Sequence, residues 1–166
     1  MMGFTPNDAL IMARNPALTK AISALVGAVY GTGTLAPGLK RLIGYINSTA
    51  AGCVYCQVHT AHGAHNAGIE AQKIQKAWEY ETSDLFSDAE RAALRVALGA
   101  GKSPNEVTDA EFADLKTYFS DDEIVEIVSV IGMFGFLNRW NSTLATELES
   151  SPLSFAKTAD IKTTDG

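Results

Sequence analysis

Apolar residues recur with a helical period along most of the chain. One stripe falls at i, i+4, i+7, i+8 and i+11, the spacing of one helix face, and consists of Leu18, Ile22, Leu25, Val26 and Val29. A second stripe begins after Pro37 and continues to about Gly52, with Leu39, Leu42, Ile43 and Ile46. No segment of useful length alternates with period two, as a half-buried strand would. The pattern therefore predicts an all-α fold, a bundle of several helices.

Start signals place further helices along the chain. Thr5, Pro6 and Asp8 predict a helix over about 6–14, and another helix begins at about Cys53 and stops at Gly68. Three S/T-x-x-E capping boxes each predict a helix start: Ser87 with Glu90, Thr108 with Glu111, and Ser120 with Glu123. Beyond the third box, residues 124–137 are apolar on every side. That helix is expected to be central, or covered by another subunit.

The helical pattern predicts one domain over residues 1–150. The tail, 151–166, has no convincing period and is interpreted as an extended arm or a partly disordered end. The glycine-rich segment 31–38 is interpreted as a linker, because a phosphate loop needs a preceding strand. Segments 41–56 and 126–141 are both apolar runs leading into polar ends, which suggests an internal helical duplication.

Composition and charge disfavour several classes of protein. The chain has 166 residues and a net charge of -6 without a basic patch, which disfavours nucleic acid as a partner. The longest apolar stretch, 124–137, is shorter than a membrane span and contains Glu126, and no secretory signal is visible. With two cysteines, a secreted disulfide scaffold is improbable. The expectation is a cytoplasmic protein without a membrane segment, metal or cofactor.

Residues 53–65, CVYCQVHTAHGAH, hold both cysteines and all three histidines. Cys53 stands at the helix start, where free backbone N–H groups favour a thiolate. Cys56 lies about 60° around the helix, a separation that allows a reversible disulfide. His59, three residues further, could take the Cys56 proton or return one to a leaving group.

Other interpretations of this segment stay open. The cysteines could be small buried hydrophobic residues, and His62 and His65 rotate away toward a surface or an interface. Four zinc ligands cannot converge from one continuous helix, because Cys53 and His62 point to opposite sides. A three-ligand zinc site of Cys53, Cys56 and His59, completed by water or another chain, is sterically conceivable.

The run LIGYINSTAAGCVYCQVHTAHGAHNAGI resembles the core of the carboxymuconolactone decarboxylase and alkylhydroperoxidase D-like (AhpD-like) superfamily, whose signature is CxxC followed shortly by His. The segments FSDAERAALRVALGAG and DDEIVEIVSVIGMFGFLNRWNSTLATELE are similar to its peroxidase-related subgroup. The resemblance covers most of residues 36–150. It implies an all-helical AhpD-like fold, homo-oligomers with helices buried between subunits, and thiol-dependent reduction of hydroperoxides.

Two positions depart from the family pattern. Thr60 occupies the place of the family histidine, and His59 stands one residue earlier; Arg41 occupies the place of the relay glutamate. Arg41 could instead stabilise a thiolate. Glu126 or Glu90 could bring a carboxylate to the site by packing.

Further pocket candidates lie beside the cysteines and at the end of the long apolar helix. Tyr55, Thr60 and His62 neighbour the pair in sequence. Asn138, Trp140 and Asn141 form a polar cluster, in which Trp140 could be a wall and Asn141 a donor to substrate oxygen. A helix end that packs an aromatic side chain on a neighbour is the alternative.

The residues together favour a homo-oligomeric thiol peroxidase or thiol-disulfide oxidoreductase, built as a trimer, dimer or hexamer. One cysteine attacks a hydroperoxide, the other resolves the sulfenic acid as a disulfide, and an external dithiol reductant restores the pair. Cys56 is favoured as the attacking thiol, with Cys53 resolving and exposed to the reductant. Rival interpretations are a non-redox decarboxylase on the same fold and a redox-sensing oligomer without turnover.

Overall fold

The computed structural model describes residues 4–31 and 33–164, which form helices and connecting turns with no β-strand among them. The elements in chain order are α1 (Asn7–Met12), α2 (Pro16–Gly31), α3 (Pro37–Ala50), α4 (Val54–Asn66), α5 (Ala71–Gln75), the 3₁₀ turn η1 (Lys76–Glu79), α6 (Asp88–Gly101), α7 (Asp109–Tyr118), α8 (Asp121–Leu144) and α9 (Ser150–Thr158). The all-α prediction is confirmed.

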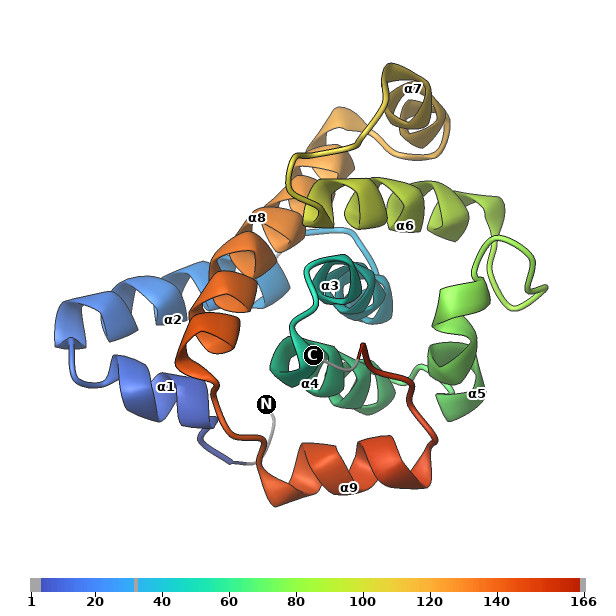
Figure 1. Ribbon diagram of the computed structural model, residues 1–166. Helices are drawn as coiled ribbons and strands as arrows, with labels where there is room; N and C mark the ends of the chain where they lie inside the picture. Colours follow the sequence, from blue (N-terminus) through green and yellow to red (C-terminus); the bar gives the residue numbers. More distant parts are fainter. Residues whose placement is uncertain (1–3, 32, 165–166) are drawn as a thin grey trace.

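Helix α3 is the centre of the bundle. Figure 1 shows it nearly end-on, with α4, α6 and α8 around it, and these three helices make its main contacts. The predicted apolar stripe explains this position, because Leu42, Ile43 and Ile46 are at most 1% exposed. Burial of such side chains contributes roughly 1.5–3 kcal/mol each. The central helix therefore fixes where α4, and with it both cysteines, can lie.

The three predicted capping boxes are present at the starts of α6, α7 and α8. In each box the hydroxyl accepts the backbone N–H of the glutamate, and the glutamate accepts the backbone N–H of the capping residue. At α8 these partners are Ser120 and Glu123. Local sequence therefore sets the starts of these helices.

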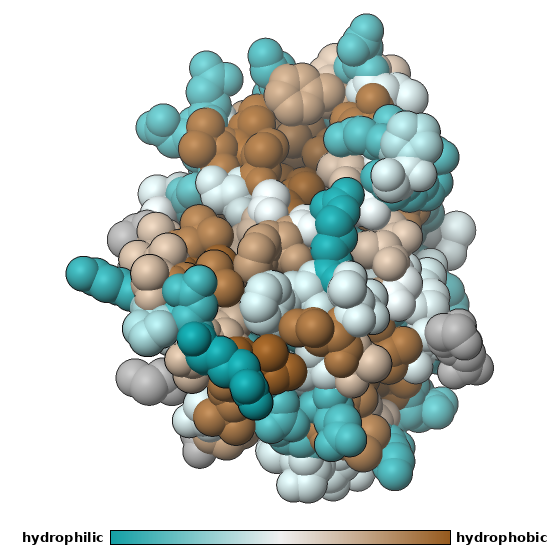
Figure 2. All heavy atoms as spheres, turned by 60° about the vertical axis from the view of Figure 1, so that its left-hand side comes forward, coloured by the Kyte–Doolittle hydropathy of each residue, from teal (hydrophilic) through white to brown (hydrophobic). Residues whose placement is uncertain are grey.

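Helix α8 is buried on one face only within this chain, so of the two expectations for residues 124–137, a central helix is wrong and cover by another subunit stays a prediction. Ile127 and Val130 are fully buried, whereas Val125 is 64% and Val128 49% exposed. Helix α2 is also poorly covered, with Val29 as its one buried residue. Figure 2, which brings the α1 and α2 side forward, shows apolar side chains spread over this face.

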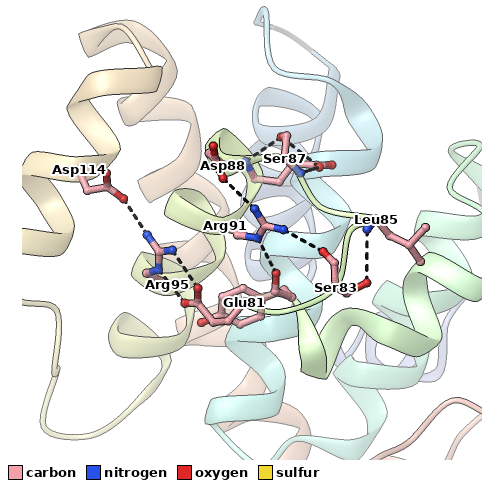
Figure 3. A network of polar contacts seen from close by, with 10 residues as sticks. Glu81, Ser83, Leu85, Ser87, Asp88, Arg91, Arg95 and Asp114 are labelled. Carbon is pink, nitrogen blue, oxygen red and sulfur yellow. Dashed lines mark hydrogen bonds and ion pairs between the residues drawn. The ribbon is translucent and has the colours of Figure 1, made fainter.

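Two arginines of α6 connect it to its neighbours (Figure 3). Arg95 forms a two-point ion pair with Glu81, at 2.6 and 2.8 Å, and a third contact with Asp114 of α7 at 2.7 Å. Arg91 donates to the backbone oxygens of Tyr80 and Ser83. This network holds the segment after η1 against α6 and α7, on the far side of α6 from α3.

The expected tail is helical up to Thr158, which corrects the interpretation as an extended or disordered segment there, and it continues as a non-helical end to residue 164. Helix α9 packs on α4, and the end after it is held by paired hydrogen bonds between Gln57 and Thr164, at 2.6 and 3.0 Å. Phe155 stacks on His65, with ring centroids 4.9 Å apart. Residues 165–166 of the expected tail lie outside the described residues. The packing of α9 matters because Glu149, the residue immediately before it, brings a carboxylate to the site.

Residues 33–36 connect α2 to α3, as expected of a linker, whereas Gly31 ends α2 and Pro37 begins α3. Residue 32 lies outside the described residues. Gly33 has φ +98°, and a Cβ there would collide with the Glu126 carboxylate. That carboxylate accepts the Thr34 backbone N–H at 2.8 Å and pairs with Lys40 at 2.8 Å. Glu126 therefore fastens the linker to α8.

The suspected internal duplication is not reproduced in the fold. Segment 41–56 contains the end of α3, a turn and the start of α4, whereas 126–141 lies inside the continuous helix α8. Within the described residues, no helix combines the length and apolar character that crossing a membrane requires.

Candidate functional site

Cys53 caps helix α4 with its own sulfur. Gly52, at φ +70°, turns the chain after α3, and Cys53 is the N-cap with extended backbone (φ -88°, ψ 92°). Its Sγ accepts the backbone N–H of Cys56 at 3.4 Å. The helix start was predicted at this residue, so the sequence places the first thiol correctly. A sulfur that occupies the N-cap position faces the free N–H groups of the first turn.

The pKa values of the two thiols are shifted in opposite directions. The Cys56 thiol, together with the Cys56 backbone N–H and the Ser142 side chain, hydrogen-bonds the Cys53 sulfur and lowers the pKa of Cys53 to about 7, although burial opposes this. The hydrogen bond to Cys53, burial, and the charge on Cys53 raise the pKa of Cys56. Of the two thiols, Cys53 is therefore the one that ionises first, near neutral pH.

Both sulfurs are enclosed, and Cys56 lines a cavity. Cys53 is 1% exposed, which corrects the expectation that it faces an external reductant directly. Cys56 lines a cavity of about 580 Å³ between α1, α2, α4 and α8. Most of this cavity is apolar, with walls from Met12, Ile22, Val26, Met133, Phe134 and Leu137. A volume of this size suits a small organic molecule.

His59 lies on the same cavity and is held by a carboxylate. Its Nε2 is 2.6 Å from Oε2 of Glu149, and its ring stacks on Tyr55 with centroids 4.2 Å apart. Tyr55 in turn donates its hydroxyl to Oε1 of Glu149 at 2.9 Å. Because Glu149 engages Nε2, Nδ1 is the imidazole nitrogen left to exchange a proton.

Glu149 remains ionised in this enclosed position. Burial acts to raise its pKa, but the backbone N–H of Asn7, the nearby His59 and the Tyr55 hydroxyl outweigh burial and lower the pKa. The carboxylate stands immediately before α9 and thus arrives from the far end of the chain. Asp8 adds a second carboxylate to the cavity wall, from α1.

Neither carboxylate proposed from the sequence lies in this cavity. Glu126 pairs with Lys40 at the linker, and Glu90 pairs with Lys73 at 2.6 Å and closes the α6 capping box. Glu149 and Asp8 were missed. Asp8 was used only as a helix-start signal, and Glu149 lies in a segment with few local signals, so no pattern in the sequence placed either carboxylate beside α4.

The polar cluster at the end of α8 is divided between two sides of the helix. Asn141 lines the Cys56 cavity and donates its Nδ2 to the Cys56 sulfur at 3.5 Å. Asn138 is buried against Asn47, and Trp140 stacks on Phe136 over a separate apolar groove, so neither reaches Cys56. Of the three candidates, only Asn141 joins the thiols.

The remaining candidates near the thiols take different places. Thr60 lines the cavity, but its hydroxyl donates to the backbone oxygens of Cys56 and Gln57. His62 packs on Phe155 of α9, away from the cavity. Arg41 lines the cavity with its guanidinium 3.7 Å from the centre of the Tyr30 ring.

Two polar atoms in the cavity wall have no hydrogen-bond partner among the residues that the structure describes. They are Oδ1 of Asn141 and the hydroxyl of Tyr30. Buried polar atoms of this kind are costly unless a ligand satisfies them. Among the described residues, no group of three or more His, Cys, Asp or Glu side chains converges as a metal site.

The sequence pattern of the carboxymuconolactone decarboxylase family matches residues 16–99, which include both cysteines and His59. The chain belongs to this family. Membership fits the AhpD-like resemblance noted from the sequence. Glu149 lies outside the matched segment.

Comparisons with individual proteins give the same fold. The structure of a cysteine-to-alanine variant of the debrominase Bmp8, in complex with 2,3,4-tribromopyrrole, is 35% identical with a TM-score of 0.91, over 95% of this chain and 84% of that one. A peroxidase-related protein of Ralstonia eutropha JMP134, described as an alkylhydroperoxidase AhpD core, is 28% identical with a TM-score of 0.80, over 93% and 81%.

A curated relative, the uncharacterized protein YnjA of Escherichia coli K12, is 29% identical over 92 residues. The match covers 55% of this chain, and the chain spans about half the length of that relative.

Proposed function

We propose that this family member is a dithiol-dependent reductase that removes a halogen from a small, apolar aromatic ring. The observation that carries the proposal is the Cys56 thiol in the wall of an apolar cavity of about 580 Å³, backed by Cys53 as resolving thiol. The likeness to a debrominase over 95% of the chain supports the choice of substrate class.

The reaction proceeds in two steps. The Cys56 proton passes to Cys53, and the Cys56 thiolate attacks the halogen; the carbon–halogen electron pair stays on carbon, which takes up a proton. Cys53, again a thiolate after losing its proton to solvent, then attacks the Cys56 sulfur of the sulfenyl halide and expels halide. A disulfide forms, so the aromatic halide and two thiols give the reduced ring, a disulfide, a proton and halide.

Neighbouring side chains assist each step. Asn141 donates to the Cys56 sulfur at 3.5 Å, which stabilises a thiolate there. His59 is oriented by Glu149 and exchanges a proton with the cavity through Nδ1. The free acceptor of Asn141 and the Tyr30 hydroxyl suit the N–H or O–H of a pyrrole or phenol.

Reduction of organic hydroperoxides is the second candidate, supported by the peroxidase-related protein of similar structure and by the His59–Glu149 pair. In that reaction Cys56 attacks the terminal oxygen, the alcohol leaves with a proton, and Cys53 displaces water from the sulfenic acid. Both reactions need an external thiol reductant to reopen the disulfide, as a reducing cytoplasm supplies.

The decisive experiment offers brominated pyrroles, brominated phenols and cumene hydroperoxide separately to the reduced protein with a dithiol reductant. Debromination predicts one bromide released and two thiols consumed per event, with loss of turnover in Cys53→Ser and Cys56→Ser. A matched His65→Gln variant, remote from the cavity, keeps full turnover. Peroxide consumption without bromide release supports the second candidate. Bromide release that persists in both cysteine variants contradicts the proposal and favours a non-redox enzyme.

A further inference from the structure

A second cavity, of about 350 Å³, lies on the other flank of α8 from the substrate cavity. Residues 133, 134, 137 and 141 of α8 face the substrate cavity, whereas 135, 138, 139 and 142 face the second one. At about 100° per residue, the centres of these two sets are more than a quarter turn apart around the helix axis. Ser142, which hydrogen-bonds the Cys53 sulfur, and Ala51 of the preceding turn both line the second cavity. The two thiols therefore lie between two cavities, Cys56 on one and Cys53 behind Ser142 on the other.

A chain of buried amides defines what the second cavity can bind. Asn47 donates its Nδ2 to the Ala97 carbonyl at 3.1 Å, and Asn138 donates its Nδ2 to Oδ1 of Asn47 at 3.2 Å. Because a carbonyl oxygen can only accept, these contacts fix the orientation of both amides. Oδ1 of Asn138 is then an acceptor, in a side chain that is 3% exposed, and it has no partner within the described part of the chain. A ligand that satisfies it must bring an N–H or O–H donor.

Arg139 adds a positive charge to the same cavity. Its guanidinium donates to the Gly135 backbone oxygen at 2.8 Å and forms no ion pair within residues 4–31 and 33–164. Guanidinium groups bind carboxylates in a two-point geometry. The cavity thus combines a cation and an unsatisfied acceptor with Ser142, whose side chain adjoins the Cys53 sulfur, in a volume at the lower end of small-molecule sites.

We infer that the second cavity is the reductant site and that it binds a small peptide thiol, with its amide N–H on Asn138 and a carboxylate on Arg139. The inference rests on the proposed function in one respect, that a Cys53–Cys56 disulfide must be reopened. It assigns substrate and reductant to separate cavities on either side of one disulfide.

The exchange balances with two molecules of the thiol. The first thiolate attacks the Cys53 sulfur, the Cys53–Cys56 bond breaks, and Cys56 leaves as a thiolate that Asn141 stabilises. The second thiolate attacks the ligand sulfur of the mixed disulfide and releases the Cys53 thiolate, which Ser142 and the α4 N-terminus stabilise. The products are the reduced pair and the disulfide of the peptide thiol.

The test uses the protein oxidised with diamide, so that it does not depend on any substrate. Reopening of the disulfide is followed with glutathione, which carries amides and carboxylates, and with 2-mercaptoethanol, which carries neither. We expect Arg139→Gln to slow reduction by glutathione about tenfold, the usual effect of one lost charge-assisted contact, and to leave 2-mercaptoethanol unaffected. Arg14→Gln, a charge-matched control on the α1–α2 turn, should change neither rate.

The position of attack gives an independent readout. In Cys56→Ser, glutathione disulfide should modify Cys53 at a rate that Arg139→Gln lowers. The inference is overturned if Arg139→Gln slows reduction by glutathione and by 2-mercaptoethanol equally, or slows neither. It is also overturned if glutathione is found bonded to Cys56 in the wild-type protein, or if only protein dithiols reduce the disulfide. If glutathione reduces the disulfide as expected but no organic halide or peroxide oxidises the reduced protein, the proposed function is contradicted. The assignment of the reductant site is unaffected by that result.

Discussion

At the scale of single residues, the two cysteines differ because one sulfur serves as the N-cap of α4. The Cys56 N–H and thiol and the Ser142 side chain all hydrogen-bond the Cys53 sulfur, and they hold the pKa of Cys53 at about 7. Deprotonation therefore creates the thiolate as the pH rises through neutrality. Titration of the ultraviolet thiolate absorbance of the reduced protein should show one transition near pH 7.

Two variants check the assignment of that transition. Cys53→Ser should abolish it, and Ser142→Ala should move it to higher pH, because one hydrogen bond to the thiolate is lost. A transition near pH 7 that survives in Cys53→Ser would assign the low pKa to Cys56 instead.

His59 is expected to support the thiol chemistry through its contact with Glu149. His59→Gln should slow oxidation of the reduced pair by substrate about 10²-fold, the usual contribution of a positioned proton-transfer group, while the fold is retained. Glu149→Gln should share part of this loss and change the dependence of the rate on pH. His62→Gln is the matched control, since His62 contacts Phe155 outside the cavity. Equal oxidation rates for His59→Gln and wild type across the neutral pH range would contradict this role of His59.

The sequence identified one half of the site and missed the other for a physical reason. Cys53, Cys56 and His59 lie within a single helical turn or two, so periodicity alone places them together. Glu149 is 90 residues from His59, and their contact depends on how α9 returns to α4. No local pattern encodes a contact of that range. Arg41 lines the cavity with its guanidinium over the Tyr30 ring, and its stabilisation of a thiolate stays a prediction.

At the scale of elements, Glu126 holds the linker against α8 and does not line the Cys56 cavity. Its carboxylate faces the buried Lys40 and the linker backbone, and it lies outside the Cys56 cavity. Glu126→Gln should therefore lower the free energy of unfolding by about 2 kcal/mol, the scale of a hydrogen bond to a charged group. Turnover should stay within about twofold of wild type, because no group in the cavity moves.

Urea denaturation and steady-state rates measure the two quantities separately. Glu79→Gln, which breaks the exposed pair with Lys76, is the control and should leave stability unchanged. A large loss of turnover in folded Glu126→Gln would return this residue to the list of catalytic candidates.

Element starts were predictable where the cap is local, and α9 was not. The capping boxes of α6, α7 and α8 each lie within four residues. Helix α9 has nine residues, no side-chain cap and two buried side chains, Pro152 and Ala156, too few for a period to stand out. Its helical state is set by packing on α4, which tertiary contacts decide.

At the scale of the whole molecule, several large apolar side chains of α2 and α8 are exposed. The outer side of α8 carries Val125 at 64%, Val128 at 49% and Leu144 at 47% exposure, and α2 is apolar along most of its length. We propose that these faces are covered in a homo-oligomer. Sedimentation equilibrium should give a mass of at least twice 17.7 kDa at micromolar concentration.

Charged substitutions on this surface supply the check. Val125→Glu combined with Val128→Glu should shift the protein toward the monomer without unfolding it, because both side chains point away from the core. Ala113→Glu on α7 is a control for added charge alone. A wild-type protein that sediments as a monomer contradicts the proposal.

The carboxylate of Glu149 reaches His59 from a part of the chain that the family pattern does not include, since the matched segment ends at residue 99. The sulfur chemistry and its proton-handling partner are therefore encoded in separate stretches of the gene. Recombination or drift downstream of α8 can exchange one acid for another while the dithiol is inherited intact. Relatives with the same CxxC pair can thus diverge in reaction by changing their ends, and grafting residues 145–164 onto such a relative is a direct way to transfer this protein's acid.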